Sequence, residues 1–152
     1  TGGGGFLGSQ LCTKLLERGS LTGPSGIAEP IDEVVLLDAA YHKVSTDSRV
    51  KQIVGDISDR DTVFEVIGNS ADTAIFHLAS MVSGECELRF DDAMRVNLDG
   101  GRNIFEAARA AMGKPRVVFH EVDGVRHVLV LAVFAVVSFW IALALTRKRF
   151  RS

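Results

Sequence analysis

The chain has 152 residues, 47% of them hydrophobic, which is enough for one domain with a substantial core. Lys and Arg number 17 and Asp and Glu number 19, so the formal net charge is −2, and no basic run in the body of the chain predicts a nucleic-acid partner. Cys12 and Cys86 lack CxxC spacing and a histidine cluster, which indicates reduced thiols of a cytoplasmic protein, one on a helix and one in a loop, rather than a metal site or a disulfide framework.

The first eight residues, Thr1 to Gly8, form a glycine-rich run that is typical of a phosphate-binding turn leading into a helix. Glycines let the backbone approach a pyrophosphate, and the N–H groups of the helix then point at its charge. Such a turn normally follows a β-strand, and no strand precedes it in this sequence. The helix is predicted over 8–18, because Leu7, Leu11 and Leu15 recur at helical spacing and Gly19 can end it.

Strands and helices alternate in the rest of the chain. The sequence predicts a loop over 20–30, strands over 33–37, 50–54, 73–79 and 116–119, a helix capped by Ser58, a loop around 82–84 and a long helix over about 90–111. Gly100 and Gly101 interrupt the long helix, and we expect close packing on a sheet to compensate for them. This order predicts an α/β fold: a Rossmann-like doubly wound parallel sheet, truncated by the missing first strand, with ligands at the carboxyl ends of its strands.

Three segments end strands at this expected ligand edge. Asp38 lies about thirty residues beyond the glycines, where a carboxylate would accept hydrogen bonds from ribose hydroxyls and repel a 2′-phosphate, which favours NAD over NADP. Asp56 could meet the adenine edge, and the small residues that follow His77 would let a cofactor lie against the backbone. The alternatives are that Asp38 begins a turn and that Asp56 belongs to a helix N-terminus, while His77 is expected to be a packed, hydrogen-bonded side chain rather than a ligand or a base.

Together with the run Val96 to Gly100, these segments resemble the extended short-chain dehydrogenase/reductases, which include the NAD-dependent epimerases and dehydratases, over Thr1 to Phe119. The resemblance implies an NAD site. Its pyrophosphate would be held by Gly2, Gly5, Phe6, Leu7 and Gly8, and its adenosine ribose by Asp38. Asp56 and Ile57 would lie at the adenine, and Leu78, Ala79 and Ser80 would lie along the nicotinamide side. It also implies that Asn97 lies near the cofactor and that Val82 and Ser83 lie near the substrate. The alternative for Asn97 is a mid-helix polar residue that bonds the backbone.

The catalytic residues of the family are missing from this pattern. The family uses a Ser or Thr after the fifth strand and a Tyr-x-x-x-Lys whose Lys lowers the pKa of the Tyr. The single tyrosine, Tyr41, has its nearest lysine two residues on, at Lys43, and residues 120–124 stand where serines are expected. The resemblance therefore implies the NAD-binding portion of an enzyme that oxidises a secondary alcohol of a sugar or sugar acid, inactive as this chain and without catalytic residues.

The last part of the chain has a different composition. Residues Val128 to Leu145 contain no charge and are long enough to cross a bilayer as a helix, and a basic tail follows at 147–152. That tail would keep the C-terminus in the cytoplasm and place the dinucleotide-binding part on the other side. The alternatives are a membrane helix that anchors a non-catalytic nucleotide-binding module, and a sequence junction in a truncated or frame-shifted gene that yields a non-functional fragment. The expected divisions are 1–119, a junction at 120–127, a hydrophobic helix at 128–146 and the tail.

Overall fold

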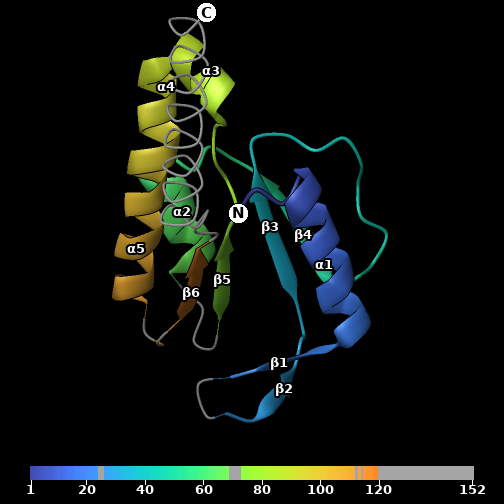
Figure 1. The fold of residues 1–152 in the computed structure, drawn as a ribbon. Helices are drawn as coiled ribbons and strands as arrows, with labels where there is room; N and C mark the ends of the chain where they lie inside the picture. Colours follow the sequence, from blue (N-terminus) through green and yellow to red (C-terminus); the bar gives the residue numbers. More distant parts are fainter. Residues whose placement is uncertain (24–25, 69–72, 112, 114, 120–152) are drawn as a thin grey trace, which may run out of the picture. The chain divides into compact units, whose positions relative to one another are not determined.

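The computed structural model describes residues 1–23, 26–68, 73–111, 113 and 115–119 (Figure 1). All of them belong to one compact unit that ends at residue 120. Its elements in order are α1 (Phe6–Arg18), β1 (Ser20–Thr22), β2 (Ala28–Pro30), β3 (Val34–Asp38), β4 (Val50–Val54), α2 (Arg60–Ile67), β5 (Ala74–His77), α3 (Ser83–Leu88), α4 (Phe90–Met94), a π-helical turn (Arg95–Asp99), α5 (Gly100–Ala110) and β6 (Arg116–Phe119).

The predicted junction, hydrophobic helix and basic tail, at 120–152, lie outside the described residues. Within the described ranges, no helix is both long enough and apolar enough to cross a membrane.

The parallel pairing predicted from the order of elements is confirmed for two pairs of strands. In the first pair, β3 and β4 run parallel from Val34 opposite Val50 to Asp38 opposite Val54. In the second, β5 and β6 run parallel from Ala74 opposite Arg116 to His77 opposite Phe119. The carboxyl ends of β3 and β5 carry Asp38 and His77, two of the polar residues that the sequence placed at the ligand edge.

The predicted loop over 20–30 is wrong, because β1 and β2 form an antiparallel hairpin with Leu21 opposite Glu29. The hairpin is closed near its tip by a hydrogen bond of 2.9 Å from the Gly23 N–H to the Ile27 carbonyl. Gly26 has a φ of 79°, a left-handed conformation that glycine adopts without strain. A composition rich in glycine and proline suits a tight hairpin as well as an open loop, so it did not reveal the pairing.

Helix α1 begins at Phe6, two residues before its predicted start, and ends where the sequence predicted. Gly19 has a φ of 68° and donates its N–H to the Leu15 carbonyl, so the C-cap is confirmed. Helix α2 is capped by Asp59 rather than by Ser58, since the Asp59 carboxylate accepts the Asp61 N–H at 3.1 Å. The Ser58 hydroxyl instead donates to the carboxylate of Asp56, two residues earlier in the chain, so it does not cap the helix.

The predicted long helix over 90–111 is divided into α4, the π-turn and α5. Gly100, at the start of α5, packs against Ile57, because an added Cβ would lie 2.8 Å from the Ile57 Cγ2. Gly100 therefore packs closely, as expected, but against the β4–α2 connection and not against the predicted sheet. The predicted loop around 82–84 is wrong from Ser83 onward, where α3 begins, and Cys86 lies on this helix rather than in a loop.

The core of the described unit joins both strand pairs and two helices. Its buried members are Leu37, Ile57, Val63, Ile67, Ile75, Ile104 and Ala107. Helix α2 packs against α5, and Val63 and Ile104 are completely buried between these layers. Burial of each such side chain stabilises the fold by about 1.5–3 kcal/mol. The core thereby fixes the ends of β3, β4 and β5, from which the candidate site is built.

Candidate functional site

The glycine-rich turn is held between the carboxyl ends of β3 and β5. The Thr1 amine donates to the Phe76 carbonyl at 2.8 Å, and the Thr1 carbonyl accepts the Leu78 N–H at 3.2 Å. On the other side, the Gly2 N–H donates to the Leu37 carbonyl at 2.9 Å. The turn is therefore placed where ligands of parallel α/β sheets bind.

Glycine is required at Gly2 and Gly8 by close backbone contacts. Gly2 has a φ of 73°, and an added Cβ would lie 2.7 Å from the Ala79 nitrogen and from the Leu78 carbonyl carbon. An added Cβ at Gly8 would overlap the Gly2 carbonyl oxygen. The turn can close only without side chains at these two positions, which leaves its backbone open to a ligand.

The N-terminus of α1 follows this turn without a side-chain cap. Gly5 is the N-cap residue, no side chain of the described part accepts the first N–H groups, and the first turn contains no acidic residue. The N–H groups of Phe6, Leu7 and Gly8 have no acceptor within the helix itself and carry the positive end of its dipole. N–H groups in this arrangement can hold an anion such as a pyrophosphate.

Asp38 lies beside the turn, as the sequence predicted for a ribose-binding residue. Its Oδ2 accepts the Gly4 N–H at 2.8 Å, and its Oδ1 accepts the Ala40 N–H at 3.4 Å. The side chain is half-buried, so its remaining lone pairs are accessible to hydroxyl donors. Asp38 therefore both fixes the turn and offers acceptors beside it.

Asp56 and Ile57 have different surroundings. Hydrogen bonds from Ser58 at 2.7 and 2.8 Å, and then the charge of Arg95, 3.6 Å away, hold the pKa of Asp56 below its usual range. The Ile57 side chain is buried in the core, so only the backbone of this predicted adenine-site residue is available to a ligand.

Asn103 is a positioning residue that the sequence analysis missed. Its Nδ2 donates to the carbonyls of Ile57 and Ser58 at 3.1 and 3.0 Å, and the side chain is buried. The sequence feature that could have revealed it is a polar residue on the same helix face as Gly100, Ile104 and Ala107, which are buried. Asn103 fixes the segment that presents Asp56.

His77 is the packed, hydrogen-bonded residue that the sequence predicted. Only 7% of it is exposed, and its Nδ1 lies 2.7 Å from the Thr1 Oγ1. Burial, and then the charge of the N-terminal amine, lower the pKa of His77 to about 4. A neutral imidazole enclosed in this way supports the junction of the turn and β5 instead of reaching a substrate.

Leu78, Ala79 and Ser80 leave β5 beside Gly2, and Asn97 fixes the residue that follows them. The Asn97 Oδ1 accepts the Met81 N–H at 2.8 Å, while its Nδ2 donates to the Met81 carbonyl at 3.1 Å. Asn97 thus bonds the backbone of a residue 16 positions away in the chain, and its place near a cofactor stays a prediction. Val82, which is 65% exposed, and Ser83 follow at the start of α3.

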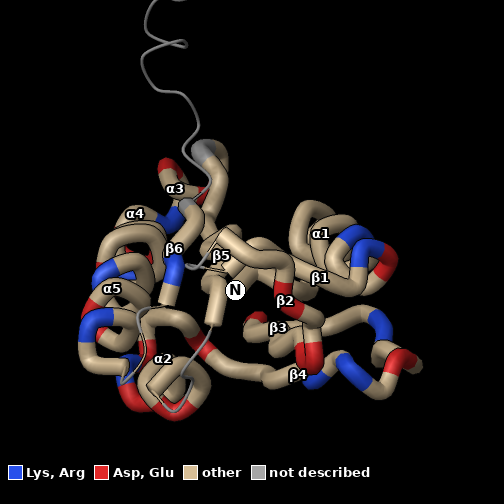
Figure 2. Tube along the Cα trace, turned by 90° about the horizontal axis from the view of Figure 1, so that it is seen from below, with Lys and Arg blue, Asp and Glu red and all other residues tan. Residues whose placement is uncertain are grey.

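Residues of both charges occur along α1 and along α5, as the colours of the Cα trace in Figure 2 show. In the part of the chain that the structure describes, no three metal-binding side chains come together. The groups that converge on the turn are therefore backbone N–H donors and one carboxylate.

A parallel α/β unit with this turn at its strand ends defines a dinucleotide-binding protein of the extended short-chain dehydrogenase/reductase class. Residues 1–125 match the model of the 3-beta hydroxysteroid dehydrogenase/isomerase family, and the chain belongs to this family. The match confirms the class that the sequence motifs indicated.

Three relatives illustrate this membership. D-erythronate dehydrogenase of Cupriavidus necator is 43% identical over 119 residues, which cover 78% of this chain and 36% of that enzyme. The structure of a nucleoside-diphosphate-sugar epimerase from Agrobacterium tumefaciens is 36% identical, with a TM-score of 0.62 over 78% of this chain and 34% of that one. A dTDP-glucose 4,6-dehydratase from Streptomyces venezuelae, solved with NAD bound, is 26% identical, with a TM-score of 0.61 over 76% of this chain and 36% of that one.

The chain therefore spans about a third of the length of these relatives. In the sequence, the segments Gly19 to Gly23, Val82 to Gly84 and Met94 to Asn97 resemble the D-erythronate dehydrogenase group, and the 43% identity to one such enzyme agrees with this resemblance.

Proposed function

We propose that this chain is the NAD-binding portion of an extended short-chain dehydrogenase that oxidises a secondary alcohol of a sugar or sugar acid. The observation that carries the proposal is the Gly2–Gly8 turn, which ends in an uncapped helix N-terminus and has the Asp38 carboxylate fixed beside it by Gly4. The similarity to a D-erythronate dehydrogenase and to a nucleoside-diphosphate-sugar epimerase supports the substrate class.

The residues present fit NAD. The N–H groups of Phe6, Leu7 and Gly8 would hold the pyrophosphate, and Asp38 would accept the ribose hydroxyls. Asp56 would lie at the adenine, and Leu78, Ala79, Ser80 and Asn97 would line the nicotinamide side. Val82 and Ser83 would lie towards the substrate. When bound, the nicotinamide supplies the acceptor for a hydride, and the role of these side chains is to bind and orient it.

We further propose that this chain alone does not turn over substrate, because Tyr41 is unsuited to proton transfer. Burial, and then the charge of Asp38, raise the pKa of Tyr41 to about 12. Its hydroxyl is buried with no hydrogen-bond partner among the described residues. A catalytic tyrosine needs a pKa near the working pH, which requires the opposite shift. No NADH should form when the purified chain is mixed with NAD and a panel of sugar acids, and formation above background would contradict this proposal.

The cofactor assignment is tested by the preference for NAD over NADP. The wild-type chain should bind NAD at least about tenfold more tightly than NADP, a difference of ~1.4 kcal/mol. Asp38→Asn removes the charge that repels a 2′-phosphate, so most of the preference for NAD over NADP should be lost. Titration calorimetry of each variant with both dinucleotides measures this preference. Asp61→Asn, an exposed carboxylate in the first turn of α2, should leave it intact. Equal affinities of the wild-type chain for both dinucleotides would contradict the assignment.

The alternative function is a membrane-anchored, non-catalytic nucleotide-binding module, which the charge-free run from Val128 to Leu145 favours. Flotation of the whole chain with lipid vesicles separates the two proposals. Co-flotation that is lost when charged residues replace part of this run would favour the module. A chain that stays unbound in the absence of detergent favours the enzyme portion.

A further inference from the structure

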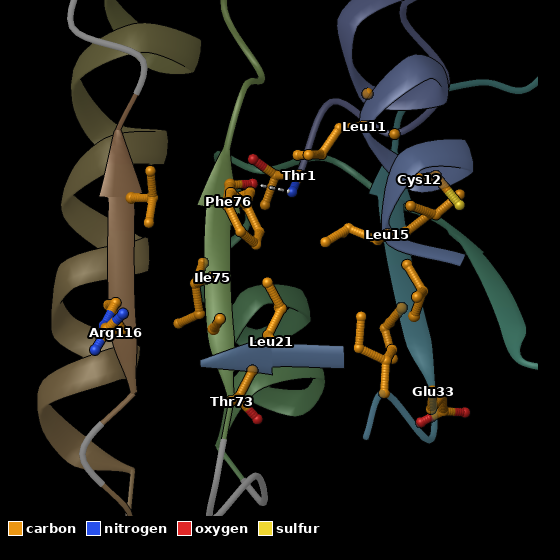
Figure 3. A pocket seen from close by; sticks show the side chains of 18 of the residues that line it. Thr1, Leu11, Cys12, Leu15, Leu21, Glu33, Thr73, Ile75, Phe76 and Arg116 are labelled. Atoms are coloured by element: carbon orange, nitrogen blue, oxygen red, sulfur yellow. Dashed lines mark hydrogen bonds between the residues drawn. The ribbon is translucent and has the colours of Figure 1, made fainter. Parts of the chain in front are cut away.

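The base of the proposed dinucleotide is expected beside the end of β4. The glycine-rich turn begins at Thr1, which is held on β5 by the bond from its amine to the Phe76 carbonyl (Figure 3). Asp38, at the end of β3, is proposed to hold the ribose, and Asp56, just beyond the end of β4, is proposed to lie at the adenine. The polar groups around the Asp56 carboxylate would therefore decide which base is accepted.

The two carboxylate oxygens of Asp56 have different partners. Oδ1 accepts the Ser58 N–H at 2.8 Å and the Ser58 hydroxyl at 2.7 Å. Oδ2 lies 3.6 Å from an Nη1 of Arg95, which is longer than the ~2.7–3.2 Å of an ordinary N–H···O hydrogen bond. In the part of the chain that the structure describes, no group donates a hydrogen bond to Oδ2, so this oxygen can accept one from a ligand.

The Arg95 guanidinium is held by charge rather than by hydrogen bonds. Its Nη1 lies 3.6 Å from Asp56, and its Nη2 lies 3.5 Å from Asp92. Asp92 is itself fixed by Arg89 at 2.6 Å. Among the described residues, no hydrogen bond uses the N–H groups of this guanidinium, and the side chain is 55% exposed, against 44% for Asp56. Arg95 thus offers donors directly beside the free acceptor of Asp56.

Backbone packing fixes the position of this donor and acceptor. Arg95 begins the π-turn, which continues directly into α5. From α5, Gly100 packs against Ile57, and Asn103 donates to the Ile57 carbonyl at 3.1 Å. Because Ile57 follows Asp56 directly, these contacts hold the guanidinium and the carboxylate together before any ligand binds, which lowers the entropy cost of binding.

A donor beside an acceptor is complementary to one edge of adenine. At this edge the N6 amino group donates and the ring nitrogen N7 accepts, and a single Asn or Gln side chain can pair with both. Asp56 Oδ2 and the Arg95 guanidinium supply the same combination from two side chains. The charge on the guanidinium strengthens a hydrogen bond to N7, and the charge on the carboxylate strengthens one from N6.

We propose that Arg95 reads the base of the dinucleotide, with its guanidinium donating to N7 of adenine while Asp56 accepts from the N6 amino group. This inference rests on the proposed function and adds to it a specificity-determining residue from the π-turn. The site then recognises both polar groups of this edge.

Two analogues that differ from NAD only in the base separate the two contacts. In the 7-deazaadenine analogue a C–H group replaces N7, and in nicotinamide hypoxanthine dinucleotide a carbonyl replaces the amino group. Because the pyrophosphate and riboses are the same, the contributions of the turn and of Asp38 cancel. In titration calorimetry, the whole wild-type chain should bind NAD at least about fivefold more tightly than either analogue.

Substitutions of Arg95 assign the contact with N7. Arg95→Met removes the donor and the charge but keeps an unbranched side chain, so NAD and the 7-deazaadenine analogue should bind within about twofold of each other. The preference for NAD over the hypoxanthine dinucleotide should remain, because Asp56 still repels the carbonyl. Arg95→Lys keeps a charged donor and should restore part of the preference for N7. Arg102→Met, an exposed arginine of α5, is the matched control and should keep both wild-type preferences.

A purely structural role of Arg95 predicts a different result. Arg95→Met would then weaken NAD and both analogues by the same factor and leave the preference for N7 intact, and this outcome would overturn the proposal. Equal affinities of the wild-type chain for NAD and the 7-deazaadenine analogue would overturn it too, while NAD binding itself still supports the proposed function. Absence of NAD binding by the wild-type chain would contradict both.

Discussion

One strand of each parallel pair, β3 and β5, ends in a polar residue beside the glycine-rich turn, yet these two residues have opposite surroundings. Asp38, at the end of β3, is half-buried and bonds the Gly4 N–H, so part of its carboxylate is accessible. His77, at the end of β5, is 7% exposed and bonds Thr1. A strand end at the ligand edge therefore supplies a binding residue only where the turn above it leaves the side chain open.

The largest effect is expected on the side of the turn. Gly8→Ala would place a Cβ against the Gly2 carbonyl, so the turn cannot close. We expect NAD affinity to fall by about a hundredfold or more and the free energy of unfolding to fall by ~1–3 kcal/mol. Calorimetry and urea titration measure the two effects. Gly84→Ala is the matched control, since its Cβ would enter open space. Equal behaviour of both variants would remove the basis for a tightly packed turn.

The side of His77 is tested by pH. Its pKa is lowered from 6.5 to about 4 in the folded chain, so the unfolded chain binds this proton more readily. Stability should therefore rise with pH between about 4 and 6.5 and be lost as the pH falls through this window, by about 2–3 kcal/mol.

Urea titrations across this range measure the slope, and His77→Gln should flatten it. The pKa values of the carboxyl groups of Asp47, Asp56 and Glu106 are lowered in the folded chain, so the stability that these groups contribute is lost only as the pH falls below about 4.5. An unchanged slope in His77→Gln would assign the pH dependence to another group.

Removal of the Asn103 hydrogen bonds, which fix the segment that carries Asp56, should change the free energy of unfolding by a similar or smaller amount. Asn103→Ala removes the donors to the Ile57 and Ser58 carbonyls and should lower the free energy of unfolding by ~1–3 kcal/mol. Arg102→Ala, next to it but on the exposed face, should cost less than about 1 kcal/mol. If the two variants were equally stable in urea, Asn103 would not position this segment.

The smallest effect is expected on the proposed nicotinamide side. Asn97→Ala removes both bonds to Met81, in an exposed setting, so the loss of stability should be about 1 kcal/mol or less. NAD affinity should fall only a few fold, because the segment from Leu78 to Ser80 is still held by Thr1. Leu98→Ala, which is 59% exposed, provides the control. A loss as large as that of Gly8→Ala would show that this side holds the cofactor instead.

The sequence predicted the features that depend on local pattern. The glycines at the turn, the strand from Val50 to Val54 and the C-cap at Gly19 follow from spacing and residue type, and the structure confirms their placement. Asp38 was placed beside the turn because parallel strands end at a common edge.

The features that the sequence did not predict depend on contacts between distant segments. The β1–β2 hairpin has the composition of a loop. Asn97 lies on a π-turn whose irregular backbone has no sequence pattern, and its bond to Met81 joins two elements. Ile57 was assigned to the adenine side but is buried against Gly100, because α5 packs over it.

The most direct test of the central claim is an NAD titration followed at individual amides of the labelled chain. The N–H groups of Gly4, Phe6, Leu7 and Gly8 should show the largest saturable shifts, with a common dissociation constant. NADP at the same concentrations should shift them weakly. Saturable shifts centred elsewhere, or none at this turn, would contradict the assignment of the turn and Asp38 as the dinucleotide site.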